Sequence, residues 1–256
     1  TTTTVQDGVS TQKTFSYNAN EEHTNVIKTT TTGSDNLSLE TKVYYPDDVT
    51  GFSVMAEGGN LSTNEYDQID KLKKDDLHRI NTPIQVVTKK DGQVLSVQRN
   101  LFDTFGTLVF QNETKASKGT NALETTAIID DRDSKGNILQ YHTPDGKYVS
   151  IIWGYDKTLP IAKLENTQYT TIEAINSFGS NFNIAENLTS IQEFYLREIS
   201  NALVTTYDYE VLVGVTKITD HKKYSTFYEY DQFNRLKRVI DSDGNILSEN
   251  TYHYKN

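Results

Sequence analysis

Clustered carboxylates are the side chains of this sequence best suited to chemistry. Asp241, Asp243 and Asn245 could fill positions 1, 3 and 5 of an EF-type calcium loop, and a similar acidic cluster occupies residues 130–133. Position 12 of such a loop needs a glutamate, but here it is Tyr252. A tight hairpin turn uses the same Asp, Asn and Gly residues. We therefore predict turns at these positions and no metal site.

The sequence contains no recognisable catalytic motif. There is no His-Glu-x-x-His, no Gly-x-Ser-x-Gly and no glycine-rich phosphate loop. The 35 carboxylates do not single out a pair for glycoside hydrolysis. The histidines, none with a supporting motif, are His23, His78, His142, His221 and His253. We predict no catalytic residue, no cofactor and no enzyme activity.

Trp153, the only tryptophan, is a candidate ligand platform together with Tyr155. Exposed aromatic rings can stack on sugars, so a carbohydrate-binding surface is one interpretation. The favoured interpretation is that Trp153 packs against the sheet or a neighbouring helix, because it follows Ile151 and Ile152.

Composition restricts the class of protein. The 256 residues have a net charge of −10, which argues against nucleic-acid binding. There is no cysteine, and the longest apolar run, residues 149–153, is far too short to span a bilayer. The 16 Tyr and 10 Phe residues, together with abundant Thr, favour β-sheet.

A repeat of about 20 residues dominates the C-terminal part. Its strand signature is a pair of tyrosines two positions apart, spaced by 21 and then 24 residues, at Tyr207 and Tyr209, Tyr228 and Tyr230, and Tyr252 and Tyr254. Two turns follow the middle copy: one begins at Asp231 and ends before Leu236, and the other contains Asp241 and Gly244. A fixed period of this length predicts stacked hairpins in which no single unit buries its own face.

Degenerate copies of the turns occur upstream, at residues 90–95, 102–108, 133–139 and 143–147. The whole chain is therefore predicted to be mainly β, with consecutive hairpins forming an extended, curled antiparallel sheet. We expect two regions: residues 1–130 with a polar insertion near 56–82, and residues 131–256 with a helical insertion at 169–203.

Two segments break the hairpin pattern. Glu65–Ile80 is either a short helix or an exposed loop. Residues 187–203 predict an amphipathic helix, with Ser190 and Glu193 as a capping box. The apolar face of that helix is expected to comprise Leu188, Ile191, Tyr195, Ile199 and Ala202.

The repeat residues resemble a known family. The run from Tyr228 through Leu236 and on to Leu247 resembles the YD repeat of RHS proteins, teneurins and insecticidal toxin-complex shells. Two further segments, Ile152–Ala162 and Leu212–Asp220, resemble the large secreted YD-repeat proteins of Flavobacterium-like Bacteroidetes. The strong part of the resemblance covers residues 137–256.

The resemblance implies a non-catalytic scaffold or shell segment at the surface of, or secreted by, a Gram-negative bacterium. It implies type IX secretion, and as partners the rest of a larger polypeptide and outer-membrane secretion channel components. The Asp-Pro-x-Gly-Leu element and the Asp pair used for self-cleavage in RHS toxins are missing, so no toxin or peptidase activity is carried over. Two alternatives stay open: a surface adhesin or carbohydrate-binding module, and the shell portion of a polymorphic toxin whose toxin domain lies outside this chain.

Overall fold

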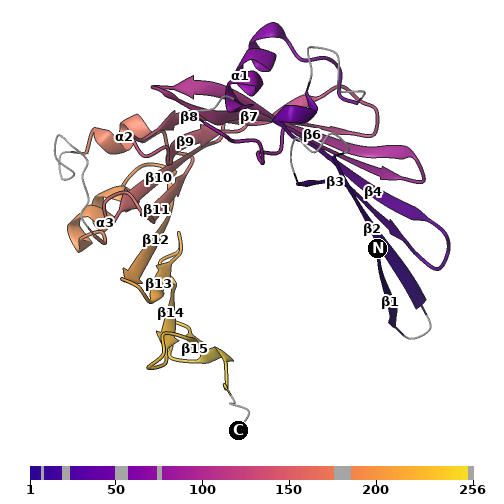
Figure 1. Ribbon diagram of the computed structural model, residues 1–256. Helices are drawn as coiled ribbons and strands as arrows, with labels where there is room; N and C mark the ends of the chain where they lie inside the picture. The colour runs from indigo at the N-terminus through magenta and orange to yellow at the C-terminus, as the bar shows by residue number, and fades with distance from the viewer. Residues whose placement is uncertain (7–8, 19–23, 50–56, 74–76, 176–185, 253–256) are drawn as a thin grey trace. The chain divides into compact units, whose positions relative to one another are not determined.

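The computed structural model describes residues 1–6, 9–18, 24–49, 57–73, 77–175 and 186–252 (Figure 1). The chain divides into two compact units, Thr1–Ile129 and Asp130–Asn256. Among the described residues, no helix has the length and apolar character needed to cross a membrane.

The first unit is a meander of antiparallel strands, each paired with the next one along the chain. Its strands are β1 (Thr2–Gln6), β2 (Val9–Tyr17), β3 (Val26–Thr32), β4 (Ser38–Tyr44), β5 (Gln85–Lys90), β6 (Gln93–Phe105), β7 (Leu108–Lys118) and β8 (Glu124–Arg132), which ends just past the unit boundary. The 3₁₀ turn η1 (Pro46–Asp48) and helix α1 (Thr63–Lys73) lie between β4 and β5.

The second unit has the same kind of sheet, again with strands paired in chain order. Its strands are β9 (Ile138–His142), β10 (Tyr148–Gly154), β11 (Leu159–Glu165), β12 (Leu203–Glu210), β13 (Gly214–Thr219), β14 (Ser225–Tyr230), β15 (Leu236–Ile240) and β16 (Ile246–Glu249). Helices α2 (Tyr169–Glu173) and α3 (Ser190–Arg197) lie between β11 and β12. The prediction of a mainly β protein built from consecutive hairpins is confirmed.

Helix α1 resolves the choice between helix and loop for the charged segment of the first unit. Ser62 begins it with a capping box: the Ser62 N–H donates to a Glu65 carboxylate oxygen at 2.6 Å, and Ser62 Oγ accepts from the Glu65 N–H at 3.3 Å. Ile69 and Leu72 on α1 are fully buried. Together with residues of β6, β7 and the connecting segments they form a core of Val49, Leu61, Ile69, Leu72, Ile84, Leu101, Phe102 and Val109.

A buried arginine fastens the same insertion to the sheet. Arg99 on β6 donates from Nε to Gln85 Oε1 at 2.7 Å and from Nη2 to the Gly59 carbonyl oxygen at 2.7 Å. Gln85 in turn donates to the Glu57 carbonyl oxygen at 3.0 Å. These bonds join the backbone at Glu57 and Gly59 to β5 and β6, so the polar contacts help to set the path of the segment.

The core of the second unit lies where α2 and α3 cover β10, β11 and β12 (Figure 1). Its members are Ile152, Ile161, Ala162, Leu164, Tyr169, Ile172, Leu196 and Val204. Strands β14, β15 and β16 contribute no buried side chain to it, and all of their residues are half-buried or exposed.

The predicted helix at 187–203 is partly wrong. Helix α3 is shorter, its N-cap is Thr189, and the capping box joins Thr189 to Gln192 rather than Ser190 to Glu193. Of the predicted apolar face, Leu188, Ile199 and Ala202 pack against the core of the second unit, but they flank α3. Within α3 the buried residue is Leu196, whereas Ile191 and Tyr195 are exposed. The physical reason is that Glu193 and Arg197 share the inward face with Leu196 and bond to each other and to β12, so charged residues occupy positions that an apolar pattern assigns to solvent.

Candidate functional site

The Asp-rich segments form hairpin turns of one shared geometry. In each turn the N–H of the first residue donates to the carbonyl of the fifth, and the N–H of the fourth donates to the carbonyl of the first. The fourth residue has a positive φ, between 60° and 87°, which Gly and Asn tolerate best. The turns are Asp133–Asn137, Thr143–Lys147, Asp220–Tyr224, Asp231–Arg235 and Asp241–Asn245.

The aspartate that begins a turn caps it with its carboxylate. Asp241 Oδ1 accepts the N–H groups of Asp243 at 2.9 Å and Asn245 at 2.8 Å, while Oδ2 accepts from the Asn245 side chain at 2.9 Å. Asp133, Asp220 and Asp231 accept from the third and fifth N–H groups in the same way. Gly244, with φ 85°, supplies the positive φ. The described residues contain no group of three or more His, Cys, Asp and Glu that could hold a metal ion.

The capping bonds make the turns sensitive to acid. The Arg235 side chain, and then the capped N–H groups, lower the pKa of Asp231; the Asn245 side chain and backbone N–H groups do the same for Asp241. A carboxyl whose pKa is lower in the folded state stabilises the fold above its unfolded pKa of about 3.9, and this stabilisation is lost as the pH falls through the folded pKa.

We therefore expect the free energy of unfolding to be flat above about pH 5 and to fall below about pH 4. Asp231→Asn should flatten that fall, as measured by urea unfolding at a series of pH values. Asp243→Asn is the control, because Asp243 is the third residue of its turn and donates its N–H to Asp241. An equal change in both variants would contradict the assignment of Asp231 as a titrating cap.

One tyrosine of each repeat bonds to an earlier strand: the second of the pair in the first two copies, and the first of the pair in the third copy. The hydroxyl groups of Tyr209, Tyr230 and Tyr252 donate to the carbonyl oxygens of Pro160, Val215 and Leu236, at 2.8, 2.9 and 2.8 Å. A β-bulge accompanies the first two, between Asp208 and Tyr209 and between Glu229 and Tyr230. Burial raises the pKa of Tyr209 and of Tyr230.

The other predicted repeat residues lie in the strand ladder. Tyr207 pairs with Ile218, Tyr228 pairs with Val239, and Leu236 pairs with Tyr230. Tyr207 and Tyr228 are half-buried. Tyr254 lies outside the described residues.

Removal of the Tyr230 hydroxyl tests the role of this bond. Tyr230→Phe should lower the free energy of unfolding by about 0.5–1.5 kcal/mol, because the Val215 carbonyl loses a partner in a partly buried position. Tyr228→Phe is the matched control, since the structure gives its hydroxyl no protein acceptor among the described residues, and we expect a change within about 0.5 kcal/mol. Denaturant unfolding of both variants measures the difference. Equal losses would mean that the hydroxyl bond contributes nothing specific.

Trp153 and Tyr155, the candidate ligand platform, both make hydrogen bonds within the protein. Trp153 is half-buried, and its indole Nε1 donates to the Ile138 carbonyl oxygen on β9 at 2.9 Å. The Tyr155 hydroxyl donates to the Tyr209 carbonyl oxygen at 3.1 Å, and the two tyrosine rings meet edge to face, 5.9 Å apart. The polar edges that would orient a sugar are thus already bonded to the backbone.

The turn after Trp153 has an uncommon backbone. Tyr155, Asp156 and Lys157 are consecutive non-glycine residues with φ values of 52°, 53° and 59°. The left-handed region costs a non-glycine residue roughly 1 kcal/mol or more, so contacts must hold this turn. Asn137 Nδ2 donates to the Lys157 carbonyl oxygen at 2.7 Å, and Lys135 pairs with Asp156 at 2.8 Å. The neighbouring Asp133–Asn137 turn therefore fixes the strained one.

Known proteins provide only distant comparisons. No protein-family model matches the chain, and no curated protein matches it. Among solved structures, TcdB2-TccC3 without its hypervariable C-terminal region is similar with a TM-score of 0.36 and 9% identity, over 86% of this chain and 11% of that one. TcdB2-TccC3 itself gives a TM-score of 0.34 at 9% identity, over 87% of this chain and 12% of that one. At so low an identity and TM-score, the likeness assigns neither family nor function.

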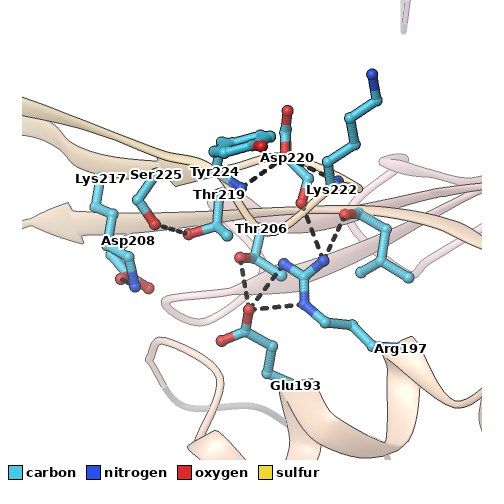
Figure 2. A network of polar contacts seen from close by, with 11 residues as sticks. Glu193, Arg197, Thr206, Asp208, Lys217, Thr219, Asp220, Lys222, Tyr224 and Ser225 are labelled. Atoms are coloured by element: carbon cyan, nitrogen blue, oxygen red, sulfur yellow. Dashed lines mark hydrogen bonds and ion pairs between the residues drawn. The ribbon is translucent and has the colours of Figure 1, made fainter. Parts of the chain in front are cut away.

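The polar network that sequence reasoning missed is centred on Arg197 of α3 (Figure 2). Its side chain is only 9% exposed. Nη1 donates to the carbonyl oxygens of Val204 at 3.1 Å and Asp220 at 3.0 Å, and Nη2 pairs with Glu193 at 2.8 Å. One guanidinium thus joins α3 to β12 and to the turn after β13. The spacing of Glu193 and Arg197, four residues apart, is the sequence signal that could have indicated the pair.

Hydroxyl groups extend this network across the sheet, as Figure 2 shows. Thr206 and Thr219, both buried, lie opposite each other on β12 and β13. Thr206 Oγ1 donates to Glu193 at 3.4 Å, and Thr219 Oγ1 bonds to Ser225 Oγ at 3.0 Å. The Ser225 N–H donates to Ser242 Oγ at 3.0 Å. Each of these hydroxyl groups bonds to another group of the protein, so the network holds neighbouring hairpins together.

The structure brings one histidine to a carboxylate. His142 Nδ1 lies 2.8 Å from Asp130 Oδ1, and Gln140 donates to the other Asp130 oxygen at 2.9 Å. The sequence did not show this pair, because the two residues lie on adjacent strands. The arrangement orients the imidazole and links β8 to β9.

Proposed function

We propose that this chain is a non-catalytic scaffold segment of a larger secreted or surface YD-repeat protein. The observation that carries the proposal is the use of the repeat residues: the aspartates cap their own turns, and Tyr209, Tyr230 and Tyr252 each bond to an earlier strand. Their recurrence is explained by the geometry of the hairpin, without any requirement for catalysis.

The distribution of burial supports a role within a longer polypeptide. Strands β14, β15 and β16 have no buried side chain, so these hairpins are stabilised by their neighbours in the sheet and not by a core of their own. Stacked repeats of this kind are stabilised by contact with neighbouring units. The rest of the polypeptide is the partner that this architecture requires.

Export by type IX secretion, the Bacteroidetes origin and a Gram-negative cell surface belong to the proposal through the resemblance of Ile152–Ala162 and Leu212–Asp220 alone. A direct test uses the native full-length polypeptide and an antibody against this chain. Intact cells and culture supernatant are probed with and without external protease, in the native strain and in a strain lacking the secretion channel. Surface signal that depends on the channel is expected; a signal confined to the cell interior in both strains would refute the export.

The scaffold role is tested against the adhesin alternative with Trp153→Ala. We expect this variant to lower the melting temperature, since the indole bonds Ile138, and to leave glycan-array retention at background, as in the parent chain. Retention by the parent that is abolished by Trp153→Ala without unfolding would establish a carbohydrate-binding module instead.

A further inference from the structure

One hairpin tip of the second unit presents an apolar residue to solvent at an unfavourable backbone conformation. The turn between β12 and β13 is closed by the Val213 N–H, which donates to the Glu210 carbonyl oxygen at 3.1 Å. Leu212 at this tip is 94% exposed, and Val211 beside it is 61% exposed. Leu212 also has a φ of 65°, a value that favours Gly or Asn.

A leucine at this position breaks two local preferences, one for polar residues at exposed tips and one for glycine at positive φ. Natural sequences break such rules mainly where function compensates, so the tip indicates a contact beyond the hairpin itself. Four other turns of this unit have Gly136, Gly146, Asn234 and Gly244 at their positive-φ positions. Lys223 and residues 155–157 also have positive φ without being Gly or Asn, but among the described residues Leu212 is the aliphatic one.

A small pocket lies at the other end of the same strand. It has a volume of about 60 Å³ and is lined by Arg197, Ala202, Val204, His221 and Lys223. Val204 is buried and Ala202 half-buried, so the floor is apolar, while His221 and Lys223 are exposed at the rim. Strand β12 runs from Leu203, beside the pocket, to Glu210 at the tip, and eight residues of strand span about 26 Å.

The charges of the pocket leave its rim cationic. Arg197 is bonded to Glu193 and to two carbonyl oxygens (Figure 2). The Asp220 carboxylate accepts the N–H groups of Lys222 and Tyr224 within its own turn. Lys223 is therefore the exposed cation beside an apolar floor. The tip is complementary to it, with an apolar Leu212 flanked by the exposed residue Glu210.

We propose that the Glu210–Val213 tip docks into the Ala202/Val204 pocket of a second copy of this chain, with Leu212 against the floor and Glu210 beside Lys223. Tip and pocket lie at opposite ends of one strand, so a hairpin cannot satisfy the contact within itself. The contact is heterologous, joining the end of one sheet to the opposite end of the next. It does not depend on the scaffold proposal and would stand or fall separately.

A contact this small is weak between free chains, with a dissociation constant on the order of 10⁻⁴ M or weaker. Repeated along a sheet, or made between parts of one long polypeptide, it gains from effective concentrations in the millimolar range. The test must therefore trap the contact covalently.

The absence of cysteine makes such trapping clean. One population of the full chain carries Val211→Cys at the tip, and a second carries His221→Cys at the pocket rim; the two are mixed and oxidised. Heterodisulfide yield is compared with a control mixture in which the first population carries Gln232→Cys, an exposed residue of the Asp231–Arg235 turn at the same end of the strands. We expect the tip–pocket pair to exceed the control by about fivefold or more.

Second substitutions identify the contact. Leu212→Ser in the tip population should reduce the yield to the control level, and Glu210→Lys should also reduce it. Lys223→Glu in the pocket population should restore the yield with Glu210→Lys, because the charge pair is then reversed. Glu210, Leu212 and Lys223 are exposed, so the variants are expected to keep the parent melting temperature, which circular dichroism checks. A yield equal to the control, or no restoration by the reversed pair, would overturn the proposal.

Discussion

Leu196→Ala is expected to lower the free energy of unfolding by about 2–5 kcal/mol. Leu196 is fully buried and is the contact of α3 with the core formed by β10, β11 and β12. Truncation removes apolar contacts and leaves a cavity that a sheet on one side and a short helix on the other can fill only in part. Urea unfolding followed by circular dichroism measures the loss.

The matched control is on the same helix. Ile191 is 66% exposed, so Ile191→Ala should change the free energy of unfolding by no more than about 0.5 kcal/mol. Comparable losses for the two variants would show that α3 packs through the face expected from the sequence pattern. A loss confined to Leu196 supports the orientation in which Glu193 and Arg197 also face inward.

Arg197→Ala is expected to cost about 2–4 kcal/mol. Its guanidinium, only 9% exposed, bonds the Val204 and Asp220 carbonyl oxygens and pairs with Glu193. Its removal takes a donor from each carbonyl oxygen and leaves Glu193 without its ion-pair partner. Arg197→Lys should recover less than half of the loss, because a single ammonium cannot reach acceptors that lie in different directions.

Arg238→Ala is the control for Arg197→Ala. Arg238 pairs with Glu229 at 2.6 Å, but both side chains are more than a third exposed, at 34% and 42%. Solvent screens such a pair, and its loss should cost at most about 1 kcal/mol. If Arg197→Ala costs no more than Arg238→Ala in the same unfolding measurement, α3 is not anchored by Arg197.

The turns could be predicted from the sequence because their geometry is local. An Asp at the first position and a Gly or Asn at the fourth determine where Asp241–Asn245 and Asp231–Arg235 reverse the chain, whatever lies around them. The strands then follow as the segments between turns. The sequence also allowed a choice between a calcium loop and a turn. Tyr252 stands at the position where the loop spacing requires a glutamate ligand.

The face of α3 could not be predicted, because an apolar pattern treats Glu193 and Arg197 as solvent residues. The burial of Arg197 depends on acceptors supplied by Val204 and Asp220, which are close only after β12 and β13 have paired. Trp153 presents the same difficulty. Its indole N–H donates to the Ile138 carbonyl oxygen on an adjacent strand, and no residue near Trp153 in the sequence indicates that acceptor. Side chains whose partners come from another strand are the ones that sequence reasoning leaves open.

Pairing in chain order has a consequence for how each unit acquires its structure. Every strand after β1 hydrogen-bonds to the strand made just before it. Most closing loops are therefore short and relative contact order is low for an all-β protein, the exceptions being the insertions between β4 and β5 and between β11 and β12. A chain that emerges from its amino end, from a ribosome or a narrow channel, can add hairpins one at a time to an existing sheet edge. It need not wait for a distant strand, and the exposed edge that invites aggregation is occupied by the next segment as soon as that segment appears.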